Sequence, residues 1–408
     1  MKEIRKRECP LILLLVMIIF SQNVYAFSQL ATGYWALARN VVQLIVLLLL
    51  AIGILRKDKV DRNVLCIYVI FVANLLVTMF WFMDFAGTYW ILDCTIAFLF
   101  VELYDEYSIA EKFEKIMFVI CCVYTLLYLI TVGNWEILKT PICLLMEKMH
   151  LIWHHSSVYE YYVSGAASLR SYAIFREPGV YQMFIILALI VEIFVRKKMR
   201  WWHAGVYILA LLATRSTTGY ICLLLVACMV VIKYWKITPV TLLFAGGGLA
   251  ASIPILPRIL SSIAAKFTAT GGSSHSWLSR LASVVTNLYF WKESPVIGVG
   301  ISRIYNDFEV VTREVFGLQA GAYSIKDDTN TILLFFAAFG IVAGFLFVVG
   351  MYGFCKKMAR TKLLTLILFV TFVCLYAGEA VNSTCYPYIL FFIGINGVLG
   401  KKEAECVV

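Results

Sequence analysis

The chain has 408 residues, of which 62% are hydrophobic and 15% are charged, and its formal net charge at pH 7 is +10. An ordinary soluble domain carries about 25% charged residues, so this composition excludes a soluble protein. The positive charge does not indicate nucleic-acid binding, because the basic residues gather in short turns between apolar stretches, where they would lie beside anionic membrane lipids. We therefore predict an all-α polytopic membrane protein.

Apolar stretches suited to membrane-spanning helices recur along the whole chain. A helix needs about 20 residues to cross roughly 30 Å of hydrocarbon, and the stretches at 201–214 and 219–232 are the shortest that we include. About twelve transmembrane helices are predicted, in a single integral membrane domain covering residues 1–408. The predicted spans lie at roughly 10–28, 36–55, 64–84, 88–104, 116–132, 178–195, 201–214, 219–232, 238–254, 329–353, 363–378 and 385–399.

Basic residues fall in every second turn between these spans. The basic turns hold 22 of the 35 Lys and Arg residues, and the positive-inside rule places them, with both termini, in the cytoplasm. An alternative for the N-terminus is a cleaved signal peptide, because Val24-Tyr25-Ala26 resembles a small-residue cleavage site after an apolar run. The basic turns are residues 1–9, 56–62, 105–115, 196–200, 233–236, 355–362 and 401–408.

Two long loops, residues 133–176 and 255–328, are predicted on the opposite, extracytoplasmic side. In the second loop, apolar residues recur at helical spacing from Trp277 to Leu288, while Arg280 and other polar residues line the opposite face. The pattern predicts a helix that rests on the bundle with Arg280 directed away from lipid.

Five arginines lie on the extracytoplasmic side, although the bias of membrane insertion disfavours basic residues there. Arginine keeps its charge when buried, and its planar fork donates two hydrogen bonds to a phosphate group. We therefore interpret these residues as contacts for an anionic ligand. They are Arg170, Arg176, Arg215, Arg280 and Arg303.

Two of these arginines come just before predicted helices. Arg176 precedes a Pro-Gly pair that suits a first helical turn, whose free amide groups could join the guanidinium group in binding one anion. Arg215 precedes the hydroxyl residues 216–218, which could complete a phosphate-binding cup. The alternatives are that Arg176 merely pairs with Glu177, and that Arg215 anchors its helices at the membrane surface.

Two carboxylates are candidates for a general base. Asp328 stands at the start of a late span and Glu177 stands beside Arg176, and either could take a proton from an attacking sugar hydroxyl. For Asp328 the alternative is a role in capping the helix. Asp93 and Glu102 lie within a predicted span, where they are either packing residues or the proton-relay groups of a transporter.

No cofactor is predicted, because no nucleotide-binding or metalloprotease motif occurs in a usable context. Glu147, His150 and His154 could share one helical face and bind zinc. The same segment reads plainly as a helix lying in the membrane interface, so we predict no bound metal.

Five short motifs, covering residues 170–345 in order and spacing, resemble those of the O-antigen polymerase and ligase superfamily of bacterial inner-membrane glycosyltransferases. The resemblance implies a GT-C-like, metal-independent enzyme with its active site on the extracytoplasmic face of the membrane. The motifs are Phe175-Arg176-Glu177-Pro178-Gly179-Val180-Tyr181, Ala213-Thr214-Arg215-Ser216-Thr217-Thr218-Gly219, Ser279-Arg280-Leu281, Ser294-Pro295-Val296-Ile297-Gly298-Val299-Gly300, and Thr329-Asn330-Thr331-Ile332-Leu333 followed by Gly340 and Gly344.

The resemblance further implies that Arg170, Arg176, Arg215 and Arg280 bind the pyrophosphate of an undecaprenyl-linked glycan donor and stabilise it as it departs. The implied partners are undecaprenyl-pyrophosphate-linked oligosaccharides, membrane lipids and a chain-length regulator protein. Ligases of the superfamily usually carry His immediately before the Asn of the last motif, where this chain has Thr329. The departure favours a polymerase of repeat units; a ligase-type transferase and a polysaccharide flippase are the alternatives.

Overall fold

The computed structural model describes residues 7–24, 27, 34–57, 60–132, 170–234, 274–317 and 328–399. Every regular element in these ranges is a helix, and the two backbone bridges, Arg7–Tyr104 and Val24–Phe175, are isolated. The elements are α1 (Leu11–Ile19), α2 (Tyr34–Leu55), α3 (Arg62–Trp81), η2 (Phe85–Gly87), α4 (Thr88–Leu103), α5 (Glu106–Val132), α9 (Pro178–Phe194), α10 (Trp201–Ala213), α11 (Thr217–Tyr234), α14 (Ser274–Glu293), α15 (Ile301–Val310), the π-helical turn η3 (Val311–Val315), α16 (Thr331–Ala359), α17 (Lys362–Gly378) and α18 (Cys385–Leu399).

Five helical stretches in the described ranges are long and apolar enough to cross a membrane: α2, α3, η2 with α4, α11 and α16. The apolar helices α9, α10, α17 and α18 are shorter. Each predicted span coincides with a helix except 238–254, which lies outside the described residues. The described helices thus define an all-α membrane protein, with five rather than twelve stretches of full spanning length among them.

α1 is much shorter than the span expected at 10–28. It has nine residues, and polar side chains follow it directly. The Ser21 hydroxyl donates to the Ile18 carbonyl (2.8 Å) and accepts from the Asn23 N–H (3.3 Å). These local hydrogen bonds offer the backbone an alternative to further helix, which is why the helix ends here.

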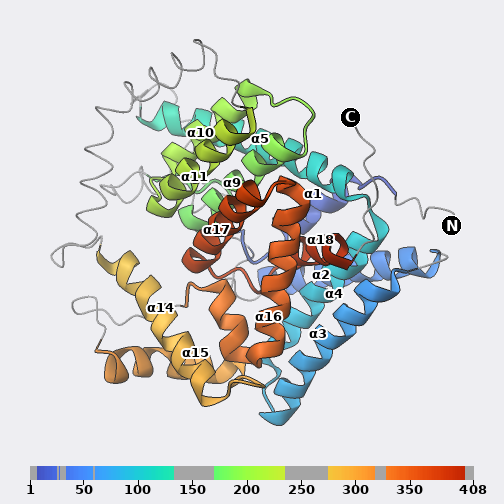
Figure 1. The fold of residues 1–408 in the computed structure, drawn as a ribbon, viewed down its shortest axis with the longest axis vertical. Helices are drawn as coiled ribbons and strands as arrows, with labels where there is room; N and C mark the ends of the chain where they lie inside the picture. The colour runs from blue at the N-terminus through green and yellow to red at the C-terminus, as the bar shows by residue number, and fades with distance from the viewer. Residues whose placement is uncertain are drawn as a thin grey trace.

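α9 lies at the centre of the bundle, where every residue from Gly179 to Ile193 is buried. Apart from Gln182 and Glu192, the side chains around this helix are mostly apolar, so every face can be buried. In Figure 1, α5, α10 and α11 gather around α9, while α2, α3 and α4 lie on another side of the molecule. Between these groups α16 packs against both α17 and α18.

α16 is broken at Gly340, where φ is +76° and lies in the left-handed region that glycine adopts freely. The segment 295–300 packs against this break through backbone hydrogen bonds, including one from the Val299 N–H to the Ala337 carbonyl (2.9 Å). A Cβ at either Gly298 or Gly340 would overlap the facing backbone. Glycine at both positions therefore lets two backbones interlock.

The turns of the described chain gather at two ends of the bundle. At one end the Arg176 N–H donates to the Asn23 carbonyl (2.8 Å), and the Arg176 Nη2 donates to the Ala380 carbonyl (2.6 Å). At the other end the Asp105 N–H donates to the Arg7 carbonyl (2.9 Å). We call the first the arginine end; it comprises residues 21–24, 170–177, 214–216, 328–330 and 379–384.

Candidate functional site

Glu379 is a buried carboxylate at the arginine end. It follows α17 in the turn that leads to α18, and 5% of its surface is exposed. The Thr331 hydroxyl donates to the Glu379 carbonyl (2.5 Å) and accepts from the Val381 N–H (3.0 Å), which fixes this turn against the start of α16. Gly179 leaves room for the carboxylate, because a Cβ there would overlap Glu379 Oε1.

Arg280 and Arg176 flank this carboxylate. Arg280 comes from α14 and places its Nη2 4.0 Å from Glu379 Oε1, with 25% of its side chain exposed. Arg176 donates from Nη2 to the carbonyl of Ala380, the next residue along (2.6 Å), and its Nε lies 3.2 Å from Glu177 Oε1. The Glu177 side chain is 48% exposed, so this second ion pair lies at the surface above the buried carboxylate.

Arg170 completes the group, donating from Nε to the Thr214 carbonyl (3.1 Å). Burial lowers the pKa of Arg170, and the charge of nearby Glu379 opposes that fall. Burial also raises the pKa of Glu379 well above its ordinary value, Glu177 raises it further, and the three guanidinium groups oppose the rise. We call this group the arginine cluster: Arg170, Arg176, Arg280 and Glu379.

Three guanidinium groups lie near two carboxylates, Glu379 in the arginine cluster and Glu177 beside Arg176, which leaves an excess of positive charge. The exposed parts of Arg176 and Arg280 remain accessible to a ligand. Guanidinium groups bind phosphate oxygens through paired, charge-assisted hydrogen bonds. The arrangement is therefore suited to an anion such as a phosphate or a diphosphate.

Arg215 lies at the edge of this cluster rather than within it. It is exposed, has a left-handed φ of 50°, and occupies the turn between α10 and α11. Its turn meets the cluster through Thr214, whose carbonyl accepts from Arg170. Of the neighbouring hydroxyl residues, Thr218 lies near Arg280 at the end of α17. Arg280 rather than Arg215 is thus the arginine beside this hydroxyl, and the phosphate cup expected around Arg215 stays a prediction.

Arg303 lies apart from the cluster. Its Nη2 is 2.6 Å from Glu293 Oε2 and its Nε is 3.6 Å from Asp307 Oδ2, and 46% of its side chain is exposed. These contacts make it a surface residue that joins α14 and α15. It serves below as a control for the arginines of the cluster.

The polar face of α14 is turned toward the bundle and holds Asp328. The buried Ser283 accepts from the Thr329 N–H (2.8 Å), and the buried Asn287 donates to Asp328 Oδ2 (2.8 Å). Asp328 Oδ1 accepts from the Asn330 N–H (2.8 Å), and burial raises the pKa of Asp328 to about 6. Because both carboxylate oxygens are occupied, the geometry favours a role in positioning the start of α16 over that of a base.

Glu379 is the carboxylate best placed to exchange a proton with a ligand at the cluster. Glu177 is half-exposed and pairs with Arg176, and Asp328 is committed to the start of α16. The sequence analysis missed Glu379. The sequence does show a carboxylate in a short turn between two apolar helices, at the end of the bundle that carries the arginines. No local motif connects this carboxylate to the arginines.

A second charged group lies elsewhere in the bundle. Glu114, Glu192 and His203 place their ligand atoms within 4.8 Å of one another, close enough to hold a metal ion. Arg200 Nη2 already contacts Glu114 (2.5 Å) and Glu192 (2.7 Å), and the Tyr207 hydroxyl donates to Glu114 (2.7 Å). The group is therefore satisfied as an ion-pair network joining α5, α9 and α10.

The carboxylates considered for a transporter make packing contacts. The Cys385 thiol donates to Asp93 Oδ1 (3.0 Å), and Lys57 Nζ lies 2.9 Å from Glu102 Oε2. These contacts favour the packing interpretation over a proton relay. The segment of the alternative zinc site, residues 147–154, lies outside the described residues.

No protein-family model matches the chain, and no curated protein matches it. Its class therefore rests on the fold and the site. It is an α-helical membrane protein that gathers three arginines around a buried carboxylate at one end of its helix bundle.

Proposed function

We propose that the chain is a polysaccharide repeat-unit polymerase of the bacterial inner membrane. It would transfer a glycan from an undecaprenyl-pyrophosphate carrier to the end of another lipid-linked glycan on the extracytoplasmic face. The observation that carries this proposal is the convergence of Arg170, Arg176 and Arg280 on Glu379. The resemblance of residues 170–345 to the polymerase and ligase superfamily supports it, because these arginines lie in or beside the resembling motifs.

In this proposal the guanidinium groups hold the donor diphosphate. The bond between the anomeric carbon and the diphosphate oxygen breaks, and its electron pair stays on that oxygen, where the fixed positive charges stabilise it. The oxygen of the acceptor hydroxyl bonds to the anomeric carbon, and its proton passes to Glu379. Glu379 is assigned this role because it is the carboxylate that lies among the guanidinium groups.

Thr329 supports a polymerase over a ligase. It stands where the resembling ligases usually carry His, and its N–H donates to Ser283 Oγ (2.8 Å). Its hydroxyl lies 3.2 Å from the same oxygen, so both groups serve the packing of α14 on α16.

The test is complementation of a strain that lacks the chain with Arg176→Lys and Arg280→Lys. We expect long-chain polysaccharide to fall at least about tenfold, because a lysine cannot form the paired contacts of a guanidinium group with a diphosphate. Arg303→Lys is the matched control and should leave chain length normal. Immunoblots of the membrane fraction establish equal insertion; normal chain length in both cluster variants contradicts the proposal.

A second measurement separates the polymerase from the flippase. Purified protein in nanodiscs receives lipid-linked repeat units with no membrane compartment to cross. A polymerase elongates them, and Glu379→Gln should slow this elongation. If the protein moves such units across vesicle membranes but never joins them, the flippase is the correct alternative.

A further inference from the structure

The Glu379 carboxylate lies where the guanidinium groups of the arginine cluster converge. Arg280 Nη2 is 4.0 Å from Glu379 Oε1, and Arg176 binds the carbonyl of the next residue, Ala380 (2.6 Å). The charges of Arg280, Arg176 and Arg170 all act on Glu379. An anion bound by these guanidinium groups therefore comes close to a second negative charge, that of Glu379 itself.

The charge of this part of the molecule depends on whether Glu379 holds a proton. Three guanidinium groups and two ionised carboxylates leave a net charge of +1, and protonation of Glu379 raises it to +2. The titratable phenol of Tyr220, on α11, lies near Arg170. The charged groups are Arg280 from α14, Arg170, Arg176 and Glu177 from the segment before α9, and Glu379 from the turn after α17.

Protonation of Glu379 removes a charge without undoing the turn that carries it. The distance of 4.0 Å to Arg280 is longer than a hydrogen bond, so this pair interacts through charge. The turn is held instead through its backbone, because the Thr331 hydroxyl donates to the Glu379 carbonyl (2.5 Å) and accepts from the Val381 N–H (3.0 Å). Burial, and then the charge of Glu177, raise the pKa of Glu379 well above its ordinary value.

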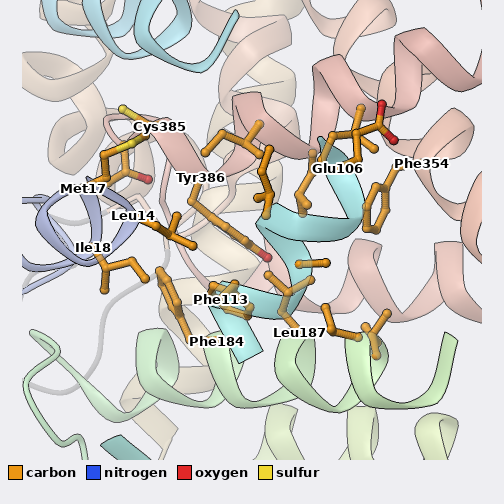
Figure 2. Close-up of a pocket in the computed structure, with 18 of the residues that line it drawn as sticks. Leu14, Met17, Ile18, Glu106, Phe113, Phe184, Leu187, Phe354, Cys385 and Tyr386 are labelled. Atoms are coloured by element: carbon orange, nitrogen blue, oxygen red, sulfur yellow. The ribbon is translucent and has the colours of Figure 1, made fainter. Parts of the chain in front are cut away.

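The interior beneath this turn is unsuited to carrying a proton. A cavity of about 80 Å³ lies between α1, α5, α9, α16 and α18, from Thr384 at the arginine end to Glu106 at the opposite end. Figure 2 shows mostly apolar side chains around it, among them Leu14, Phe113, Phe184 and Leu187. Because apolar cavities stay dry, we expect Glu379 to exchange its proton at the arginine end, where the Glu177 side chain is 48% exposed.

We propose that Glu379 is an exchangeable counter-ion of the arginine cluster: an anion binds there together with a proton taken up by Glu379, and loss of that proton releases the anion. The inference rests on the proposed function for the identity of the anion, a diphosphate. Linkage makes the effect reciprocal, because a bound anion favours the protonated carboxyl group as much as the protonated carboxyl group favours the anion.

In the proposed reaction this exchange keeps the charge of the site constant. The diphosphate gains one negative charge when its bond to the anomeric carbon breaks, and Glu379 loses one when it accepts the proton of the acceptor hydroxyl. Glu379 then gives this proton to the solution at the arginine end. Its negative charge returns beside the diphosphate and repels it, which favours release of the product.

Titration calorimetry of the full chain in nanodiscs tests the proposal with inorganic pyrophosphate. Between about pH 6 and about pH 9, the affinity of the unmodified protein should fall at least about tenfold more than that of Glu379→Gln. The glutamine cannot titrate, and the titration of pyrophosphate itself is common to both proteins. At the upper pH Glu379→Gln should therefore bind more tightly than the unmodified protein, whereas damage to the site would weaken binding.

Proton uptake is counted in the same experiment, by using buffers of different ionisation enthalpy. The unmodified protein should take up more protons per bound pyrophosphate than Glu379→Gln. Glu177→Gln is the matched control, because it removes an exposed negative charge from the same group. It should strengthen binding but keep the proton uptake. A monodisperse elution profile shows that each variant folds.

Equal pH dependence and equal proton uptake in the unmodified protein and Glu379→Gln overturn the proposal, as does a failure of pyrophosphate to bind. Sulfate does not titrate in this pH range, so its binding tests proton uptake on the unmodified protein alone if the variant does not fold. Sulfate that binds without proton uptake also overturns the proposal.

The two proposals fail separately. If the arginine variants abolish polymer while pyrophosphate binds without the proton linkage, the counter-ion role is wrong and the polymerase stands. If Glu379→Gln removes the linkage while polymer length is normal in the arginine variants, the counter-ion role stands and the polymerase is wrong.

Discussion

Glu379 occupies the space that a side chain at position 179 would fill. α9 begins with Pro178 and Gly179, and a Cβ on Gly179 would overlap Glu379 Oε1. The carboxylate therefore approaches the first turn of α9, where free N–H groups and the helix dipole favour negative charge. The requirement for glycine here comes from the arginine cluster rather than from the helix itself.

Gly179→Ala should displace the Glu379 carboxylate and destabilise the protein. Forcing an extra carbon into a packed interior costs about 1–3 kcal/mol. Gly205→Ala is the control, because a Cβ at that helical position meets nothing within 4 Å; it should be neutral or slightly stabilising. Thermal unfolding in detergent measures both. Equal effects of the two substitutions would show that Glu379 is not held against residue 179.

Arg176→Lys and Arg280→Lys should each weaken the binding of inorganic pyrophosphate about tenfold, because the ammonium group donates from one point where the guanidinium fork donates from two. Isothermal titration with pyrophosphate measures this directly, independently of any sugar. Arg303 pairs with Glu293 instead, so Arg303→Lys should bind pyrophosphate as the unmodified protein does. Binding that is unaffected in the first two variants argues against an anion site at the cluster.

Because Asp328 is buried, the free energy of unfolding should decrease as the pH rises. Burial raises its pKa from 3.8 to about 6, so the folded protein keeps a proton that the unfolded chain has released. The resulting stabilisation is fully present below pH 3.8 and is lost as the pH rises through about 6. It amounts to about 3 kcal/mol.

Asp328→Asn should remove this part of the pH dependence. The amide of Asn287 can reverse and offer its Oδ1, which has no partner among the described residues, to the new Nδ2. Unfolding temperatures at pH 4 and pH 7 test the prediction. The unmodified protein should lose more stability between these values than the variant, and parallel losses in both would count against it.

Gly298→Ala should destabilise the protein by more than about 2 kcal/mol, because it adds steric overlap with the backbone near the break in α16 to the strain of a positive φ. Gly317→Ala separates the two causes. That residue also has a positive φ, +62°, but a Cβ there meets nothing within 4 Å. The loss of stability in Gly317→Ala, measured by the same thermal unfolding, should be smaller and reports the backbone strain alone. A loss equal to that of Gly298→Ala would exclude a contribution from steric overlap.

The N-terminal segment should remain on the mature protein. Cleavage after Ala26 would remove α1, whose start is bound to α5 by the hydrogen bond from the Cys9 N–H to the Ser108 hydroxyl (2.9 Å), and Asn23, whose carbonyl accepts from the Arg176 N–H. Intact-mass spectrometry of the protein purified from bacterial membranes should give the uncleaved mass. A mature chain that starts at Phe27 and still makes polymer would contradict the role of this segment.

Hydropathy predicts helix positions well because a chain in lipid must satisfy its backbone hydrogen bonds internally. It predicts helix lengths less well. The span predicted at 10–28 extends beyond Phe20, but the hydrogen bonds of Ser21 and Asn23 end the helix. Such local competition between side chain and backbone does not appear in an average over a window of residues.

The periodicity of α14 predicts a helix and the placement of Arg280 away from lipid. It does not reveal that the polar face forms the packed surface, where Ser283 and Asn287 bind the start of α16. In a soluble protein the apolar face of a helix packs against the core. In a membrane protein that face can contact lipid instead. Glu379 was missed for a related reason, since its partners are set by tertiary packing.

The hydrogen bond from Arg176 to Ala380 joins residues 204 positions apart. During synthesis the arginines therefore emerge from the ribosome long before the turn that carries Glu379. Chains that stop short of α17 hold three guanidinium groups without their buried counter-charge. The arginine cluster is therefore complete only after the last helical hairpin, α17 and α18, has been inserted.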